Sequence, residues 1–128
     1  MRVYLCGPIN GCTDAEATDW RSAVKAEGFT CVDPMKRDYR GVEDAAYREI
    51  VDLDKRDIRE RSDVLLVNYT EPSVGTSMEV FYAWTLGKPV VVWCARDASI
   101  SPWLRYHATS FVHSLAEAVQ KLDAVGRA

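Results

Sequence analysis

The stretch from Asp63 to Trp93 constrains the fold of this chain more than any other. It consists of an apolar strand-like run over 63–69, a loop rich in Pro, Gly and Ser over 70–75, a helix-like run over 76–86 that stops at Gly87, and a second apolar run over 89–93. Apolar runs on both sides of a helix are typical of parallel strands buried between two helical layers. The unit therefore predicts a parallel, right-handed crossover.

The rest of the chain continues this alternation. We expect strands at 2–9, 30–32 and 111–113, and helices from Thr13 to near Gly28, from Val42 to about Arg61, over 103–109 and over 115–125. Thr13 with Glu16, and Ser114 with Glu117, fit capping boxes at the first and last of these helices. The pattern predicts one α/β domain over residues 1–128, with a doubly wound, mostly parallel sheet of the flavodoxin or Rossmann type.

Composition narrows the class of function. The 128 residues are 48% hydrophobic and 27% charged, as in a soluble globular domain. A net charge of −3 argues against a nucleic-acid surface and favours a small substrate. No apolar run approaches the roughly 18 residues of a membrane span, and no signal-peptide core is present, so we expect a cytoplasmic protein with no membrane partner.

Metal sites and disulfides are not expected. The four cysteines lack C-x-x-C spacing, and the two histidines lack a partner at metal-ligand spacing. These residues are Cys6, Cys12, Cys31, Cys94, His107 and His113. No cofactor is implied, so activity should survive a chelator.

Glu79 is a charged residue at the start of the predicted helix, in an otherwise uncharged run. In one interpretation Thr76 and Glu79 form a capping box, and the carboxylate only fixes the helix start. In the other, the carboxylate is placed for chemistry, since a helix N-terminus favours an ionised acid and its free N–H groups can hold a hydroxyl or phosphate. Both interpretations stay open, because one does not exclude the other.

A second carboxylate lies on the helix over 42–61. Its apolar residues fall on one stripe, and Asp54 projects within about 20° of the stripe's centre. A core-facing aspartate costs several kcal/mol unless something binds it, which makes Asp54 a functional candidate. The alternative is a helix rolled far enough for Asp54 to reach solvent or a basic neighbour. We expect Asp57 at the surface, with Arg61 four residues on. The stripe consists of Tyr47, Ile50, Val51 and Ile58.

Tyr4 alternates with Val3 and Leu5 on the first strand, so its ring should pack in the core. A buried tyrosine hydroxyl needs a hydrogen-bond partner, which we expect near the end of this strand.

Three motifs in order resemble the nucleoside 2-deoxyribosyltransferase family. They are residues 2–9 (RVYLCGPI), Asp54 with Ile58 ahead of 62–67 (SDVLLV), and 72–92 (PSVGTSMEVFYAWTLGKPVVV). The resemblance implies cleavage of an N-glycosidic bond, with Glu79 attacking the anomeric carbon to give a covalent glycosyl-enzyme, as in retaining glycosidases. It also implies that Tyr4 holds Glu79 by a hydrogen bond.

The resemblance assigns the second carboxylate less exactly. Asp54 matches the family aspartate, which would act as general acid toward the departing nucleobase. The spacing from Ile58 to Asp63 is one residue longer than the family pattern, so either Asp54 or Asp57 is the equivalent, and the stripe favours Asp54.

The residue type at position 73, here Ser73, helps to distinguish a monophosphate substrate from a free nucleoside. Family members that transfer deoxyribose tend to carry an aspartate at this position, whereas the P-S-x-G loop resembles the related 2'-deoxynucleoside 5'-monophosphate N-hydrolases. A serine hydroxyl beside the N–H groups of Val74 and Gly75 would accept a phosphate, which tilts the expectation toward a monophosphate.

The first loop would complete that phosphate site. Its residues Gly7, Asn10 and Gly11 are the candidates, since glycines permit close backbone approach, although the loop also suits a simple strand-to-helix turn. The arginine that hydrolase relatives place in this loop is missing, and Arg105, or Ser101 from a neighbouring subunit, are weaker candidates for its contact.

Hydrolysis and transfer to a second base share the first half-reaction, and hydrolysis is slightly favoured. We expect a homodimer or higher homo-oligomer, with Trp103 and Tyr106 either at its interface or packed within one subunit. The alternative function is a non-catalytic, flavodoxin-like domain that binds nucleotides as a sensor. A phospho-receiver is disfavoured because the strand over 63–69 ends in Asn68-Tyr69 rather than an aspartate, and the loop 7–12 lacks a dinucleotide fingerprint.

Overall fold

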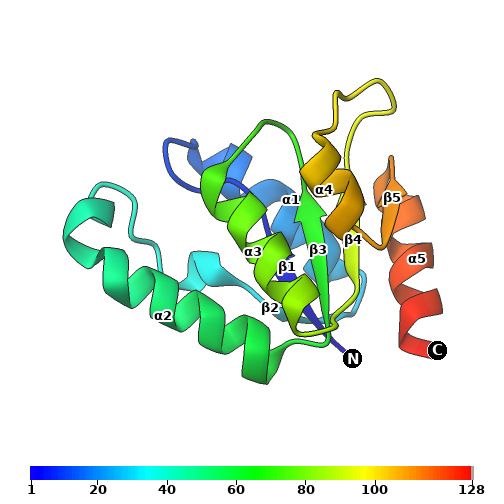
Figure 1. Ribbon diagram of the computed structural model, residues 1–128, viewed down its shortest axis with the longest axis horizontal. Coiled ribbons are helices and arrows are strands. Elements are labelled where there is room, and N and C mark those ends of the chain that lie inside the picture. The colour runs from blue at the N-terminus through cyan, green and yellow to red at the C-terminus, as the bar shows by residue number, and fades with distance from the viewer. Residues whose placement is uncertain (128) are drawn as a thin grey trace.

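A computed structural model describes residues 1–127 of the chain, which form a five-stranded sheet between two layers of helices (Figure 1). The strand order is β2-β1-β3-β4-β5, and every neighbouring pair is parallel. This is the flavodoxin-like order, so the doubly wound prediction is confirmed. The sheet is wholly parallel in the part of the chain described, and the expected strand over 111–113 is the edge strand. The strands are β1 (Arg2–Cys6), β2 (Thr30–Val32), β3 (Val64–Asn68), β4 (Val90–Trp93) and β5 (Ser110–Val112).

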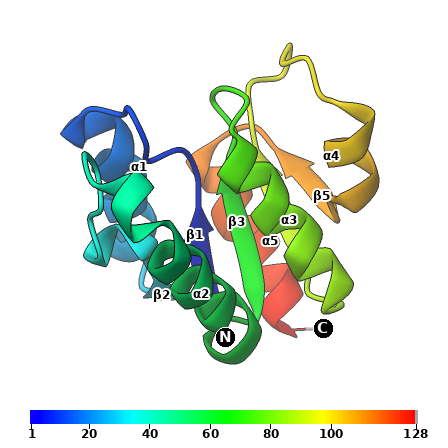
Figure 2. The ribbon, with the colours of Figure 1, turned by 60° about the vertical axis from the view of Figure 1, so that its left-hand side comes forward.

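The helices are divided between the two faces of the sheet. Figures 1 and 2 show α2 and α3 in front of the strands, with α1 and α5 on the opposite side. None of the helices described is long and apolar enough to cross a membrane. The helices are α1 (Asp14–Ala26), the 3-10 helix η1 (Pro34–Lys36), α2 (Glu43–Arg61), α3 (Val74–Thr85), α4 (Pro102–His107) and α5 (Leu115–Arg127).

The alternation of side chains along β1 assigns its residues to two cores. Val3 and Leu5 pack with residues of α1 and α5, while Tyr4 and Cys6 pack with residues of α2, α3 and α4. This follows from the two-residue period of a strand. Tyr4 is completely buried, as predicted, and its side chain lies on the α3 side of the sheet.

Helix α3 begins earlier than the sequence suggested. Ser73 is its N-cap, and the Ser73 hydroxyl oxygen accepts a hydrogen bond from the Thr76 amide at 3.4 Å. Glu79 therefore lies in the second turn, and the capping box of Thr76 with Glu79 is wrong. By contrast, the box of Thr13 with Glu16 is present, with both reciprocal hydrogen bonds formed.

Helix α2 is only partly covered by the sheet. Its first half extends past the strands on the left of Figure 1, so Tyr47 and Val51 are exposed. Of the four predicted stripe residues only Ile58 is fully buried. The prediction that this stripe faces the core is thus wrong for the first half of α2, because the core does not extend to that part of the helix.

Candidate active site

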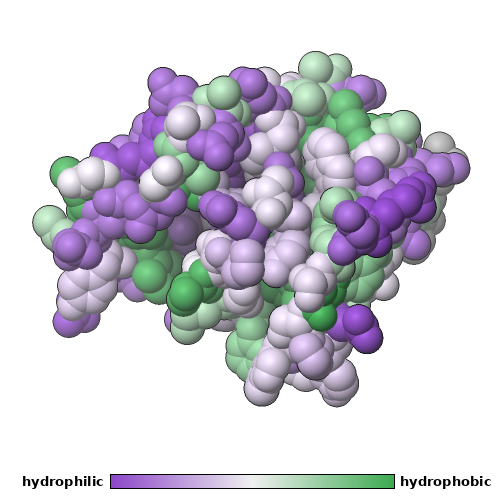
Figure 3. Space-filling view, turned by 90° about the horizontal axis from the view of Figure 1, so that it is seen from above, coloured by the Kyte–Doolittle hydropathy of each residue, from purple (hydrophilic) through white to green (hydrophobic). Residues whose placement is uncertain are grey.

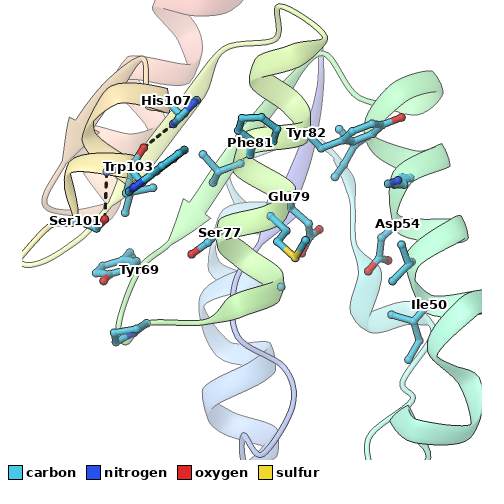
Figure 4. Close-up of a pocket in the computed structure, with 18 of the residues that line it drawn as sticks. Ile50, Asp54, Tyr69, Ser77, Glu79, Phe81, Tyr82, Ser101, Trp103 and His107 are labelled. Carbon is cyan, nitrogen blue, oxygen red and sulfur yellow. Dashed lines mark hydrogen bonds between the residues drawn. The ribbon is translucent and has the colours of Figure 1, made fainter.

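A cavity of about 1030 Å³ lies on the face of the molecule formed by α2, α3 and α4. Its volume is at the upper end of the range typical of small-molecule sites. Figure 4 shows Glu79 on α3 near its centre, Asp54 on α2 to one side, and residues of α4 on the other. Most of the wall is apolar; its charged and hydroxyl-bearing members are Asp54, Lys55, Tyr69, Ser77, Glu79, Tyr82, Ser99 and Ser101.

Glu79 is held from below by the sheet. The Tyr4 hydroxyl on β1 donates a hydrogen bond to Oε2 of Glu79. Burial, and after it the nearby charge of Asp54, raise the pKa of the Glu79 carboxyl to about 8. The hydrogen bond from Tyr4 and the positive charge of Arg21 act in the opposite direction. A carboxyl with such a perturbed pKa in a cavity is a candidate for chemistry.

Asp54 faces Glu79 across the groove between α2 and α3 (Figure 4). The pKa of its carboxyl is raised to about 6, because the effect of burial exceeds the opposing effect of the Arg37 guanidinium. Nη2 of Arg37 lies 3.4 Å from Oδ1 of Asp54. Both carboxyl groups line the cavity, the charge of Asp54 raises the pKa of Glu79, and the two pKa values lie on either side of neutrality.

Asp57 does not line this cavity, and the expectation that it lies at the surface is wrong. Its side chain is 2% exposed and is paired with Arg37 at 2.7 Å and Arg56 at 3.2 Å. Arg61, the neighbour that the sequence identified, is 3.8 Å away. A buried carboxylate requires such partners. The structure thus brings Asp54, rather than Asp57, to the cavity with Glu79.

Arg21 on α1 was not found by sequence reasoning. Its buried guanidinium donates hydrogen bonds to the carbonyls of Leu5 at 3.4 Å and Gly7 at 3.3 Å, and its Nε lies 3.4 Å from Asp33. It ties the carboxyl end of β1 to α1 and places a positive charge beneath Glu79. The sequence feature that could have identified Arg21 is its position on the buried stripe of α1, four residues after Ala17 and three before Val24.

The expected phosphate-binding residues are only partly brought together. Gly75 and Ser101 line the cavity, whereas Ser73 does not. Ser101 also caps α4 by accepting a hydrogen bond from the Trp103 amide at 3.1 Å.

The first loop, with Gly7, Asn10 and Gly11, does not contribute to the lining of this cavity. A Cβ atom at Gly7 would lie 2.9 Å from the Trp20 ring, so this glycine allows the loop to pack against α1. Gly11 has a φ of 77°, which fits the turn interpretation.

In the described part of the chain, no group of three or more His, Cys, Asp or Glu side chains is placed to hold a metal ion.

Enzymes that cleave or transfer glycosyl groups use a pair of carboxyl groups at one cavity, and Glu79 and Asp54 provide such a pair here. The sequence profile of the nucleoside 2-deoxyribosyltransferase family matches residues 3–121. The chain belongs to this family, whose enzymes act on the N-glycosidic bond of nucleosides and nucleotides.

A relative from Thermofilum pendens is 28% identical over 137 residues, which cover 98% of this chain and 94% of that protein. Its name assigns it as a 2'-deoxynucleoside 5'-phosphate N-hydrolase.

Two solved structures share the fold. The CMP N-glycosidase BcmB of Clostridium botulinum aligns with a TM-score of 0.61 at 18% identity, over 96% of this chain and 99% of its own. The 2-deoxyribosyltransferase of Bacillus psychrosaccharolyticus aligns with a TM-score of 0.67 at 16% identity, over 92% and 90% respectively.

Proposed function

We propose that this enzyme cleaves the N-glycosidic bond of a 2'-deoxynucleoside or its 5'-monophosphate through a covalent intermediate on Glu79. The observation that carries the proposal is the position of Glu79, hydrogen-bonded by Tyr4 and facing Asp54 across the cavity. Two carboxyl groups that share one proton fit one nucleophile and one proton donor. Because Glu79 has the higher pKa, the reactive form, with Glu79 ionised and the proton on Asp54, is the minor of the two singly protonated forms.

In the first half-reaction, the ionised Glu79 carboxylate attacks the anomeric carbon. The bond from that carbon to the base nitrogen breaks through an oxocarbenium-like transition state, and its electron pair leaves with the base. Asp54 donates its proton to the departing base. The products of this step are the free base and a glycosyl ester of Glu79, with Asp54 now ionised.

In the second half-reaction, water attacks the anomeric carbon of the ester. Asp54 takes the proton from that water, and Glu79 leaves as a carboxylate. A second nucleobase in place of water would give transfer instead. We favour hydrolysis, and the relative from Thermofilum pendens, named as an N-hydrolase, supports this choice.

The substrate is more consistent with a monophosphate than with a free nucleoside. Ser73 and the first-turn amides of Val74 and Gly75 form the start of α3, where a helix N-terminus favours an anion. Arg40 places a guanidinium against the first loop, where it donates to the Cys12 carbonyl at 3.1 Å. The charge of Arg40 is balanced by Asp14 and Asp38, so Arg40 would attract a phosphate less strongly than the missing loop arginine would.

The functional unit we propose is a homodimer. Trp103 and Tyr106 are 73% and 72% exposed, which argues against their packing within one subunit. They continue an apolar surface from α3 to α4, which we call the α3–α4 face: Met78, Phe81, Trp84, Trp103 and Tyr106, all at least 44% exposed. The side with α3 and α4, at the lower edge of Figure 3, has mostly pale or green atoms. A second copy would cover this face and one wall of the cavity.

Chromatography of the purified enzyme with nucleosides and 5'-monophosphates tests the reaction. Ribo and deoxy substrates should each be incubated with and without a second free base, and Glu79→Gln serves as the isosteric control. Free base from a 2'-deoxynucleoside monophosphate without an acceptor is the expected result. A new nucleoside formed only with acceptor would identify a transferase. Binding without any Glu79-dependent turnover would instead identify the sensor domain.

A further inference from the structure

An ion-pair network centred on a buried aspartate adjoins Asp54. Its centre is Asp57, 2% exposed, one turn further along α2. Arg37 comes from the segment between η1 and α2, and its Nη2 atom lies 2.7 Å from Asp57 and 3.4 Å from Asp54. One guanidinium nitrogen thus bridges two carboxylates of the same helix, of which only Asp54 lines the cavity.

The two aspartates of this network differ in how many of their carboxylate oxygens are paired. Asp57 is paired through Oδ2 to Arg37 and through Oδ1 to Arg56, so both of its oxygens are engaged. Asp54 accepts from Arg37 through Oδ1, and its Oδ2 makes no hydrogen bond among the residues described. Arg37 is therefore fixed by the buried partner, and the less buried partner is left with one oxygen available to the cavity.

We propose that Arg37 is a positioning residue: anchored by Asp57, its guanidinium orients the Asp54 carboxyl toward the cavity that contains Glu79. The assignment deepens the proposed function, since the importance of Asp54 rests on it. A short aspartate side chain on a helix can rotate among several staggered positions, and a bridging guanidinium selects one of them. Correct orientation of a proton donor matters because small misplacements cost large factors in rate.

The contact between Arg37 and Asp54 can be tested by titrating Asp54, because the pKa of Asp54 depends on the charged groups around it. Groups on four segments face it, and of these Arg37 is the cation that lowers the pKa of Asp54. The other groups that share its field are Asp57 on α2, Tyr39 on the Arg37 segment, Glu79 on α3, and Tyr4 and Cys6 on β1. Removal of Arg37 should therefore raise the Asp54 titration midpoint.

Arg56 supplies a matched control. It is an arginine paired with Asp57 at 3.2 Å, yet it makes no contact with Asp54 among the residues described. Arg37→Met and Arg56→Met both remove one guanidinium from the buried network, but only the first removes the contact with Asp54. Arg37→Lys keeps a charge at the position and should partly restore the wild-type behaviour.

The test is a carboxyl ¹³C NMR titration of Asp54 without substrate, in the wild type and these three variants. We expect Arg37→Met to raise the midpoint by about 1 pH unit, Arg37→Lys by less, and Arg56→Met to leave it unchanged. The acid limb of the pH profile of kcat/KM should move in parallel. An unchanged midpoint in Arg37→Met, or an equal shift in Arg56→Met, would overturn the proposal.

The proposed reaction and the proposed role of Arg37 can be disproved separately. If Glu79→Gln retained full turnover while Arg37→Met still moved the Asp54 midpoint, the proposed reaction would be wrong and the positioning contact would stand. If Arg37→Met does not fold, the two single variants Arg37→Gln and Arg56→Gln provide the same comparison, since the glutamine side chain is polar but uncharged.

Discussion

The Tyr4 hydroxyl on β1 donates a hydrogen bond to the Glu79 carboxyl on α3, which joins two residues 75 positions apart in the sequence. The Tyr4 ring is completely buried, so the sheet itself fixes the position of its hydroxyl. A hydrogen bond to a carboxylate favours the charged form, and the bond from Tyr4 opposes the rise in the Glu79 pKa that burial causes.

Tyr4→Phe removes this hydroxyl without removing the ring. The pKa of Glu79 should rise, and kcat/KM near neutral pH should fall about 10-fold to 100-fold, as for a lost hydrogen bond to a charged group. The alkaline limb of the pH profile should move to higher pH. Steady-state kinetics across pH, with thermal denaturation to show that the variant is folded, provides the measurement. An unchanged rate would mean that Tyr4 only packs the core.

The wild-type enzyme should show a bell-shaped dependence of kcat/KM on pH, with limbs near 6 and 8. Below the first value both Asp54 and Glu79 are protonated, and Glu79 cannot attack. Above the second both are ionised, and Asp54 has no proton to donate. Between them the pair shares one proton, and the reactive form is the minor one with that proton on Asp54, so the two limbs belong to the pair rather than to either residue. Activity that rises steadily to pH 10 would contradict the role of Asp54.

The sequence predicted the sheet and both catalytic candidates because each depends on local pattern. Buried apolar runs separated by a helix indicate parallel strands, and the alternation around Tyr4 places its ring in the core. The wrong predictions arose where two local signals compete or where the partner is distant. Ser73 and Thr76 are both good N-cap residues, and the sequence does not tell which one begins α3.

Asp57 could not have been placed from the sequence for a different reason. Its main partner, Arg37, comes from an irregular segment without periodicity, 20 residues before it. Nothing in the helix pattern shows that this segment folds back onto α2. Similarly, Tyr47 and Val51 have the spacing of core residues, but the sheet does not extend far enough to cover them.

A substitution at Ser73 tests whether a 5'-phosphate is bound at the start of α3. Ser73→Asp keeps a good helix cap but adds a negative charge, while Ser73→Asn keeps the cap without the charge. The aspartate variant should lose about 10-fold or more in kcat/KM for a monophosphate relative to the asparagine variant, with little difference between them for the free nucleoside. Equal losses on both substrates would place the phosphate elsewhere.

The α3–α4 face makes a prediction about assembly. Replacing both Trp103 and Tyr106 with Asp should convert the proposed dimer to a monomer, because two charges would be buried in an apolar interface. Val42→Asp, at an exposed apolar residue outside this face, is the control and should leave the dimer intact. Sedimentation velocity distinguishes the two states. A wild-type protein that sediments as a monomer at high concentration would rule out this interface.

Mass spectrometry of the enzyme after rapid acid quenching during turnover tests directly whether a covalent intermediate forms on Glu79. The quenched enzyme should carry a deoxyribosyl or deoxyribosyl-phosphate adduct, and peptide mapping should place it on Glu79. Glu79→Gln should show no adduct. An adduct on Asp54, or rapid turnover with no covalent intermediate under conditions that trap such esters, would contradict the mechanism.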